Sequence, residues 1–256
     1  MRIVFIRHGD PDYVNDSLTE KGKKEAAYLA EYLLKTDTGD IYCSPYGRAA
    51  RTCQAYLEKS GKSAETCEWL REFDGLISTE SEEVRSAYNF YDSTDASDKR
   101  TLRIPWDMLP EAYDKYPELF DVNKWKTSSI INQKTIDRYD HVIKKFDDLL
   151  KSKGYLNHGS YYEVKQGSHD TITFFCHLGI ECVLMAHLIN VSPFVLWQRF
   201  CSPTSSISTV YTEERKKGLA QFRILQFGAT PHLALHDMET SFSARFCEVF
   251  EDDTRH

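Results

Sequence analysis

The sequence predicts an α/β protein whose central, mainly parallel sheet is covered by helices on both faces. Two apolar runs, RIVFI at 2–6 and TITFFC at 171–176, lack the alternation of half-exposed strands and are typical of strands buried on both sides. Amphipathic helical patterns separate the predicted strands along the chain. Strands that alternate with helices favour a parallel sheet between two helical layers.

The first strand, at 2–6, leads through the polar loop DPDYVNDS into a predicted helix, LTEKGKKEAAYLAEYLL. Within that helix, Ala26, Leu29, Ala30 and Leu33 recur at the i, i+3, i+4, i+7 spacing of one helical face. We therefore expect this face to pack against the sheet.

Two residues are candidates to cap this helix at its start. They are Thr19 and Ser17, and Ser17 with Glu20 has the spacing of a capping box. The elements expected next are a short strand, a helix and a third strand-like segment, at 40–43, 46–59 and 64–69.

The pattern changes over about 76–130, which is rich in charge, Tyr, Trp and Pro and has only weak helical segments such as PEAYDKYPELF. We interpret it as a helical insertion over the active site within a single domain, 1–256. Its Trp106, Trp125 and tyrosines either line a substrate pocket or form the core of the insertion. The remaining elements are two helices and two late strands joined by the turn EERKKG, at 133–151, 179–188, 206–212 and 221–226.

The composition bounds the class of protein. With 256 residues and 41% hydrophobic residues, the chain is globular and long enough for a large core. No apolar run approaches the ~18 residues of a membrane span, and no signal peptide is evident, so we expect a cytoplasmic protein without a membrane partner. The net charge of −7 argues against a nucleic-acid partner. No oligomeric state follows from the sequence.

The seven cysteines are scattered and form no C-x-x-C pair. This odd number and spacing argue against a disulfide framework. We expect most of them to be buried thiols in a reducing compartment.

Reactive side chains follow the predicted strands. His8 follows the first strand, Arg48 the second, Glu72 the third segment and His177 the run TITFFC. In open α/β sheets the ligand binds outside the carboxyl ends of the strands. With Arg7, the set has two imidazoles, two guanidinium groups and one carboxyl group.

These residue types suit phosphoryl transfer through a histidine. An imidazole nitrogen can hold a phosphoryl group covalently, and arginines bind phosphate oxygens in a bidentate fork. A carboxyl group can protonate the leaving oxygen and later deprotonate water. This chemistry needs no metal or cofactor. His232 and His236 are four residues apart, but no third ligand accompanies them, so we predict no metal site.

Five motifs occur in order: RHG after an N-terminal strand, LTEKG, SPxxRAxxT, LRE, and a later strand that ends in His. They resemble the histidine phosphatase superfamily, with its phosphoglycerate mutase-like fold, over 1–75 and about 170–232, which includes FGATPHL.

The resemblance implies a role for each residue. His8 would be the phosphorylated nucleophile and Glu72 the general acid and base. His177, also counted among the catalytic residues, would bind the phosphate together with Arg7 and Arg48. The resemblance also suggests that Gly9 lets the backbone approach the phosphate closely.

Some of these assignments have rivals nearby. Glu68 and Asp74 compete with Glu72 for the acid and base role. His169, in GSHD, competes with His177, but it precedes the apolar strand, whereas His177 ends that strand, and we therefore choose His177.

The sequence departs from the family pattern at two places. The loop DPDYVND stands where mutases usually have a Ser and a Trp-Asn pair, which argues against a mutase. Leu178 stands where the family usually has Gly, which leaves the geometry of the turn after His177 open.

The sequence thus predicts a metal-independent phosphomonoesterase that acts through a phosphohistidine on a small phosphorylated metabolite. A phosphoglycerate-type mutase on the same fold is one alternative. A non-catalytic module that binds a phosphorylated ligand or a protein is another. The substrate itself is not identified.

Overall fold

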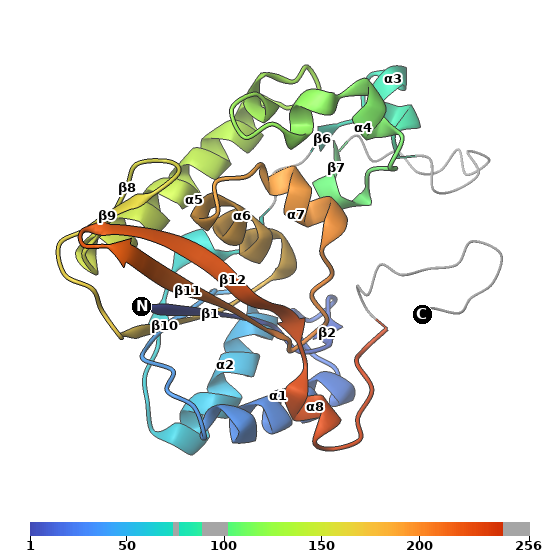
Figure 1. Ribbon diagram of the computed structural model, residues 1–256. Coiled ribbons are helices and arrows are strands. Elements are labelled where there is room, and N and C mark those ends of the chain that lie inside the picture. Colours follow the sequence, from blue (N-terminus) through green and yellow to red (C-terminus); the bar gives the residue numbers. More distant parts are fainter. Residues whose placement is uncertain (74–76, 89–101, 243–256) are drawn as a thin grey trace.

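The computed structural model describes residues 1–73, 77–88 and 102–242, and it has an eight-stranded sheet between two layers of helices (Figure 1). The strand order is β5-β4-β10-β1-β11-β12-β9-β8. In that order the strands span Glu65–Thr66, Asp40–Cys43, Thr171–Cys176, Arg2–Arg7, Ile207–Lys216, Leu219–Ala229, Tyr162–Val164 and Tyr155–Asn157. The first four run parallel and the other four extend the sheet in antiparallel fashion. The predicted fold class is confirmed.

Helices cover both faces of the sheet (Figure 1). On one face lie α1, α2 and α8, which span Glu20–Leu33, Gly47–Ser60 and Pro231–Ala234. On the other face lie α5, α6 and α7, which span Gln133–Ser152, Leu178–Leu188 and Pro193–Arg199. Strand β1 is buried on both sides. Its Val4 and Ile6 pack with α1 and α2, whereas Ile3 and Phe5 belong to the core on the opposite face.

Helix α1 has the predicted buried face, since Ala26, Leu29, Ala30 and Leu33 are all buried. Of the two candidate caps, Thr19 is the one used. Its side chain accepts a hydrogen bond from the Gly22 backbone N–H at 3.0 Å. Ser17 instead lies in β3 (Ser17–Leu18), which pairs with β2 (Pro11–Asp12) in the loop after β1.

The described part of the insertion consists of short elements. They are β6, α3, β7 and α4, at Ile77–Ser78, Glu82–Ser86, Leu102–Arg103 and Ala112–Lys115, with 3₁₀ turns at Pro105–Asp107, Pro117–Phe120 and Trp125–Thr127. Trp125 is buried, and its ring centroid lies 4.8 Å from that of Tyr139 on α5 and 6.0 Å from that of Phe194 on α7. The insertion therefore shares one continuous core with the helices of this face.

Several elements differ from the prediction. The segment 64–69 is a strand for only two residues, and a 3₁₀ turn, Glu68–Leu70, follows. Apart from the short elements of the loop after β1 and of the insertion, four described elements were not predicted, namely β8, β9, α7 and α8. Each of these has between three and seven residues. A segment that short has too few residues to display a helical or strand period.

Six of the cysteines lie in the described residues, and all six are free thiols. Five of them are buried, as expected, and Cys201 is partly exposed, while Cys247 lies outside the described residues. No helix in the described part of the chain is long and apolar enough to cross a membrane.

Candidate active site

The candidate site lies at the carboxyl ends of three neighbouring parallel strands. Arg7 ends β1 and His8 follows it, His177 follows β10, and Ser44 follows β4. The rings of His8 and His177 have their centroids 5.1 Å apart. The Oγ atom of Ser44 lies 2.8 Å from Nε2 of His177. Parallel pairing thus brings together side chains that are up to 170 positions apart in the sequence.

His8 is almost fully buried, and its Nδ1 lies 2.8 Å from the carbonyl oxygen of Gly9. Because a carbonyl oxygen only accepts hydrogen bonds, Nδ1 carries the hydrogen and Nε2 of the neutral ring has a free lone pair. Burial lowers the pKa of His8 well below its ordinary value, and the charges of Arg7 and Arg48 lower it further. The ring is therefore neutral at neutral pH, as a nucleophile must be.

His177 is fully buried, and burial also lowers its pKa well below the ordinary value, with further contributions from His8 and the two arginines. It precedes α6 with an extended backbone, φ −137° and ψ 166°. Leu178 then begins the helix without a positive φ and buries its side chain. The turn after His177 therefore does not require a glycine at 178.

Arg7 is buried at the end of β1, and one of its terminal nitrogens donates to the carbonyl oxygen of Ser202. This contact fixes the guanidinium group against the segment that precedes β11. Its charge lies close enough to His8 to lower the pKa of the imidazole.

Arg48 lies in the first turn of α2, and its Nη1 donates to Oδ1 of Asp16 at 2.8 Å. The guanidinium carbon also lies 5.5 Å from the ring centroid of Tyr13 and 5.0 Å from that of Tyr46. Such arrangements of a cation over an aromatic ring are attractive. Three groups thus hold Arg48 in place.

Asp16 and the two tyrosines were not identified from the sequence. Asp16 has a positive φ of 43°, and its Oδ2 also accepts from the Gly47 backbone N–H at 2.6 Å. Aspartate is one of the few non-glycine residues that adopt this conformation readily. The sequence shows only that an Asp occurs in a polar loop, and this does not indicate which residues its carboxylate contacts.

Glu72 follows the 3₁₀ turn Glu68–Leu70, and its side chain reaches the first turn of α6. Its Oε1 accepts hydrogen bonds from the backbone N–H groups of Phe73, at 2.7 Å, and Ile180, at 3.0 Å. Burial raises the pKa of Glu72, although these hydrogen bonds and the charge of Arg7 act in the opposite direction. The carboxyl group therefore keeps its proton to a higher pH than a free glutamate does.

The two rivals of Glu72 are placed differently. Glu68 is exposed and forms an ion pair with Arg71 at 2.5 Å. Asp74 lies outside the described residues.

Three buried nitrogen atoms in this cluster have no hydrogen-bond partner among the described residues: Nε of Arg7, Nε of Arg48 and Nδ1 of His177. Buried polar atoms in proteins are nearly always paired, so the two arginine nitrogens call for an acceptor, and Nδ1 of His177 does so in the tautomer in which Ser44 Oγ donates to Nε2. A phosphate group presents several acceptor oxygens and a charge opposite to that of the arginines. The donor set therefore fits a phosphate group.

Gly9 and Gly22 lie in close contact, which explains both glycines. A Cβ on Gly9 would lie 2.8 Å from the carbonyl oxygen of Gly22, and one on Gly22 would lie 2.2 Å from that of Asp10. We expected Gly9 to be needed for the approach of phosphate, but the neighbour the structure gives it is the first turn of α1. Asp10 also accepts from Oγ1 of Thr19 at 2.6 Å, and its N–H donates to Glu25 at 2.8 Å.

The other histidines singled out in the sequence lie elsewhere. His169 is exposed in the loop before β10, at the opposite end of that strand from His177. His232 is buried with Nε2 2.9 Å from Oγ of Ser205, and His236 stacks on Tyr28. Within the described ranges, no three His, Cys, Asp or Glu side chains are grouped so that they could hold a metal ion.

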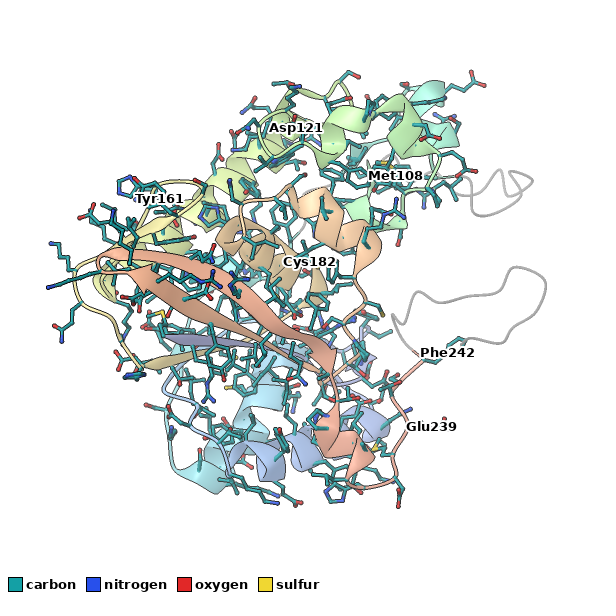
Figure 2. The ribbon with its side chains drawn as sticks, in the orientation of Figure 1. Met108, Asp121, Tyr161, Cys182, Glu239 and Phe242 are labelled. Carbon is teal, nitrogen blue, oxygen red and sulfur yellow. The ribbon has the colours of Figure 1, made fainter. Side chains whose placement is uncertain are left out.

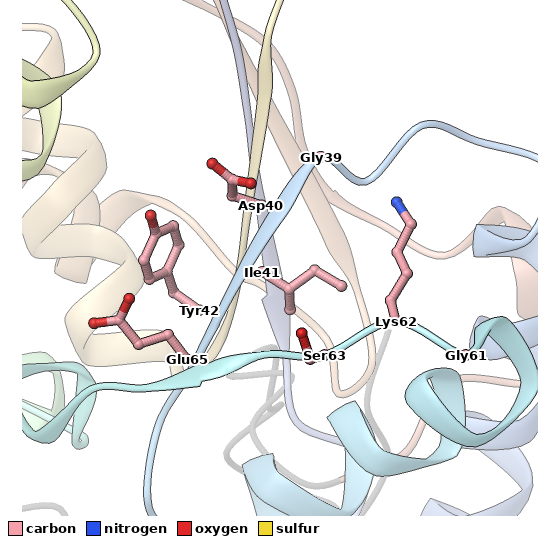
Figure 3. Close-up of a pocket in the computed structure, with 8 residues that line it drawn as sticks. All are labelled: Gly39, Asp40, Ile41, Tyr42, Gly61, Lys62, Ser63 and Glu65. Carbon is pink, nitrogen blue, oxygen red and sulfur yellow. The ribbon is translucent and has the colours of Figure 1, made fainter.

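A separate hollow of about 550 Å³ lies at the amino ends of β4 and β5, away from His8 (Figure 3). Residues from 39–42 and 61–65 line it, and none of them is a histidine or an arginine. It therefore lacks the groups that phosphoryl transfer through histidine requires.

Two histidines and two arginines gather near the carboxyl ends of these strands, and the Glu72 carboxyl group lies beside the first turn of α6, an arrangement suited to phosphoryl transfer through a histidine. Residues 3–114 match the histidine phosphatase superfamily (branch 1). The match covers 112 of the 256 residues, and over this range the chain is similar to that superfamily.

Several known proteins that are similar to the chain are named as phosphatases. A probable phosphatase of Schizosaccharomyces pombe is 23% identical over 248 residues, which are 91% of this chain and 95% of that protein. The structure of a phosphoserine phosphatase mutant from Entamoeba histolytica, in complex with phosphoserine, matches with a TM-score of 0.54 at 19% identity, over 91% of this chain and 98% of that one. A mycobacterial glucosyl-3-phosphoglycerate phosphatase matches with a TM-score of 0.56 at 18% identity, over 89% and 98%. At these identities the two structures show the shared fold alone.

Proposed function

We propose that the protein is a metal-independent phosphomonoesterase that acts through a phosphohistidine on His8, with a small phosphorylated metabolite as substrate. The observation that carries this proposal is the state of His8. Its Nδ1 is held by the Gly9 carbonyl, so Nε2 has a free lone pair, and the three unpaired nitrogens of Arg7, Arg48 and His177 belong to the same cluster.

In the first half of the reaction, Arg7, Arg48 and His177 bind the oxygens of the phosphoryl group. Nε2 of His8 attacks phosphorus in line, a P–N bond forms and the ester P–O bond breaks. Glu72 gives its proton to the leaving oxygen, so that the product is a neutral alcohol. The arginines stabilise the charge that develops on the phosphoryl oxygens.

In the second half, the Glu72 carboxylate takes a proton from water, and the resulting hydroxide attacks phosphorus. The P–N bond breaks, phosphate is released and Nε2 of His8 regains its lone pair. Glu72 thus serves as acid and then as base. A carboxyl group whose pKa is raised is suited to the first of these roles because more of it is protonated near neutral pH.

The relatives support the class of substrate but not its identity. Phosphoserine and glucosyl-3-phosphoglycerate, named for the two similar structures, are both phosphorylated small molecules. We also propose a cytoplasmic location, because the six described cysteines are all free thiols. The net charge of −7 favours no nucleic-acid partner.

The test is hydrolysis of 4-nitrophenyl phosphate in the presence of EDTA, with the native protein and the variants His8→Ala and His169→Ala. We expect the native protein and His169→Ala to release phosphate equally. We expect His8→Ala to lose at least about 10³-fold in kcat/KM while it remains folded, because it lacks the nucleophile.

Full activity of His8→Ala would overturn the proposal, and so would loss of native activity on addition of EDTA. Interconversion of phosphoglycerate isomers without release of phosphate would assign a mutase instead. Binding of inorganic phosphate without any turnover would assign a binding module.

A further inference from the structure

Trp106, in a 3₁₀ turn of the insertion, lies beside the proposed general acid. A Cβ placed on Gly179 would lie 2.5 Å from both Cη2 and Cζ3 of Trp106 and 2.6 Å from Oε1 of Glu72. Because all three atoms surround the same point, the edge of the indole and the carboxylate oxygen are no more than about 5 Å apart. Glycine at 179 thus makes room for the indole next to Glu72.

Helix α7 holds Trp106 in this position. Nε2 of Gln198 donates to the carbonyl oxygen of Pro105 at 2.8 Å, which fastens the turn to the helix. Nε1 of Trp197 donates to the carbonyl oxygen of Gly179 at 3.0 Å, and the ring centroids of Trp197 and Trp106 are 6.1 Å apart. Trp197 is buried, whereas Trp106 remains partly exposed. An anchored and partly exposed indole therefore lies next to Glu72.

Two further aromatic rings lie on the Arg48 side of the same cluster. Tyr13 is 64% exposed, and its ring lies by the Arg48 guanidinium group. Tyr46 presents its ring to Arg48 and also to His177, with the last two ring centroids 5.4 Å apart. Aromatic rings from three separate segments therefore lie around the proposed phosphate position.

The direction of the reaction places the leaving group near Trp106. In an in-line displacement the ester oxygen leaves opposite Nε2 of His8, and it must come within about 2.6–3.2 Å of the Glu72 carboxyl group to receive its proton. Because the edge of the indole is no more than about 5 Å from one oxygen of that carboxyl group, the carbon skeleton of the alcohol would lie next to the indole. Since the insertion supplies this side chain, it contributes to the part of the site that holds the alcohol.

We infer that Trp106 forms the binding surface for the alcohol part of the substrate, and that the preferred substrates are phosphate monoesters whose alcohol carries an aromatic or other flat ring. This inference rests on the proposed function. A flat ring gains from stacking or edge contact with the indole, and a short aliphatic chain does not gain in the same way.

The test compares benzyl phosphate with propyl phosphate, whose alcohols are similar in basicity and differ in the ring. We expect the native protein to prefer benzyl phosphate. We expect Trp106→Ala to lower kcat/KM for benzyl phosphate by about 3- to 10-fold and to leave propyl phosphate nearly unchanged. Trp106→Phe should keep most of the preference. The matched control is Tyr161→Ala, an exposed ring close to β8 and β9, which should change neither rate (Figure 2).

Equal rates for the two esters in the native protein would overturn the inference and leave the phosphatase function standing. An equal loss for both esters in a folded Trp106→Ala variant would do the same. If the native protein hydrolyses neither ester, the proposed function is judged by hydrolysis of 4-nitrophenyl phosphate, and binding of the two esters to His8→Ala by calorimetry decides on the subsite. The inference is supported if His8→Ala binds benzyl phosphate more tightly than propyl phosphate and the additional substitution Trp106→Ala removes this difference. Equal affinities for the two esters would overturn the inference.

Discussion

Among single residues, those that we propose to bind the phosphate depend on others that orient them. Arg48 is the clearest case, because its guanidinium group has a carboxylate on one side and tyrosine rings close by. Asp16 supplies that carboxylate and also accepts from the backbone N–H of Gly47, so it fixes both the side chain of Arg48 and the start of α2. We regard Asp16 as a positioning residue for phosphate binding.

Replacing Asp16→Asn should weaken phosphate binding more than it slows turnover. Asn can still accept from Gly47, but it has no charge with which to hold Arg48. We expect KM for a phosphate ester and the inhibition constant of inorganic phosphate to rise together by about 10-fold or more, the range for hydrogen bonds to charged groups. Steady-state kinetics with phosphate as inhibitor measure both quantities.

The control for this change is Asp12→Asn in the same loop. The Asp12 carboxylate accepts from Val14 and Asn15, and it has no contact with Arg48. A lower melting temperature for Asp16→Asn with unchanged KM and inhibition constant would reduce Asp16 to a purely structural role.

The sequence identifies residues that follow strands better than residues that orient them. His8 and His177 follow apolar runs, and parallel pairing of those runs is enough to bring them together. The partners of Asp16 depend on a positive φ and on a loop folded back through β2 and β3, which no local pattern encodes. The role of Trp106 likewise depends on the contact of an irregular turn with Gly179.

For whole elements, the contact between the loop after β1 and the first turn of α1 positions His8, the proposed nucleophile. Gly9 and Gly22 allow the two backbones to meet, and Asp10, Thr19 and Glu25 close the contact with hydrogen bonds. The LTEKG motif therefore forms the start of α1, against which the loop containing RHG packs.

The variant Gly22→Ala should destabilise the protein, although alanine favours a helix over glycine by up to about 1 kcal/mol. The added Cβ would lie 2.2 Å from the carbonyl oxygen of Asp10, so the loop or the helix must move. We expect a net loss of about 1–3 kcal/mol in the free energy of unfolding, measured with urea, and a loss of activity because His8 shifts with its loop.

Lys24→Ala in the same helix is the control, because Lys24 is exposed and its substitution should change stability by less than about 0.5 kcal/mol. If Gly22→Ala proved as stable as the native protein or more so, the close contact would not limit this position.

The elements that the sequence predicts are those with a clear period. Strands β1 and β10 and helices α1, α2, α5 and α6 lie close to their expected bounds. Strands of three residues and helices of a turn or two have no such signal, and their formation depends on neighbours such as β12, against which β9 pairs. The 3₁₀ turns of the insertion are hidden for the same reason.

Over the whole molecule, His8 and Glu72 belong to segments far apart in the chain, and their environments move their pKa values in opposite directions. The pKa of His8 is well below 6.5, mainly through burial, and that of Glu72 is raised above 4.5, also through burial. In the proposed mechanism the active form has neutral His8 and protonated Glu72. Activity is therefore lost at low pH as His8 gains a proton, and at higher pH as Glu72 loses one.

We expect kcat/KM for benzyl phosphate to have its acidic limb well below pH 6.5 and to fall again as the pH rises above the ordinary range of a glutamate. With 4-nitrophenyl phosphate, whose leaving group needs no proton, the alkaline decline should be weaker. The phosphate groups of the two esters lose their second proton at different pH, so each kcat/KM value is first corrected for the fraction of ester present as dianion, and the ratio of the corrected values across pH then isolates Glu72. A ratio that does not change with pH would exclude Glu72 as the acid for the leaving group.

The packing of Trp125 against Tyr139 and Phe194 has a consequence for how the substrate range of such a protein can change. Because the insertion and the helices below it bury the same side chains, it is not a cassette that can be exchanged between relatives. A graft would bring foreign side chains into a core that they did not evolve to fill. New specificities are therefore more accessible, to evolution and to the protein engineer, by single substitutions at partly exposed positions such as Trp106.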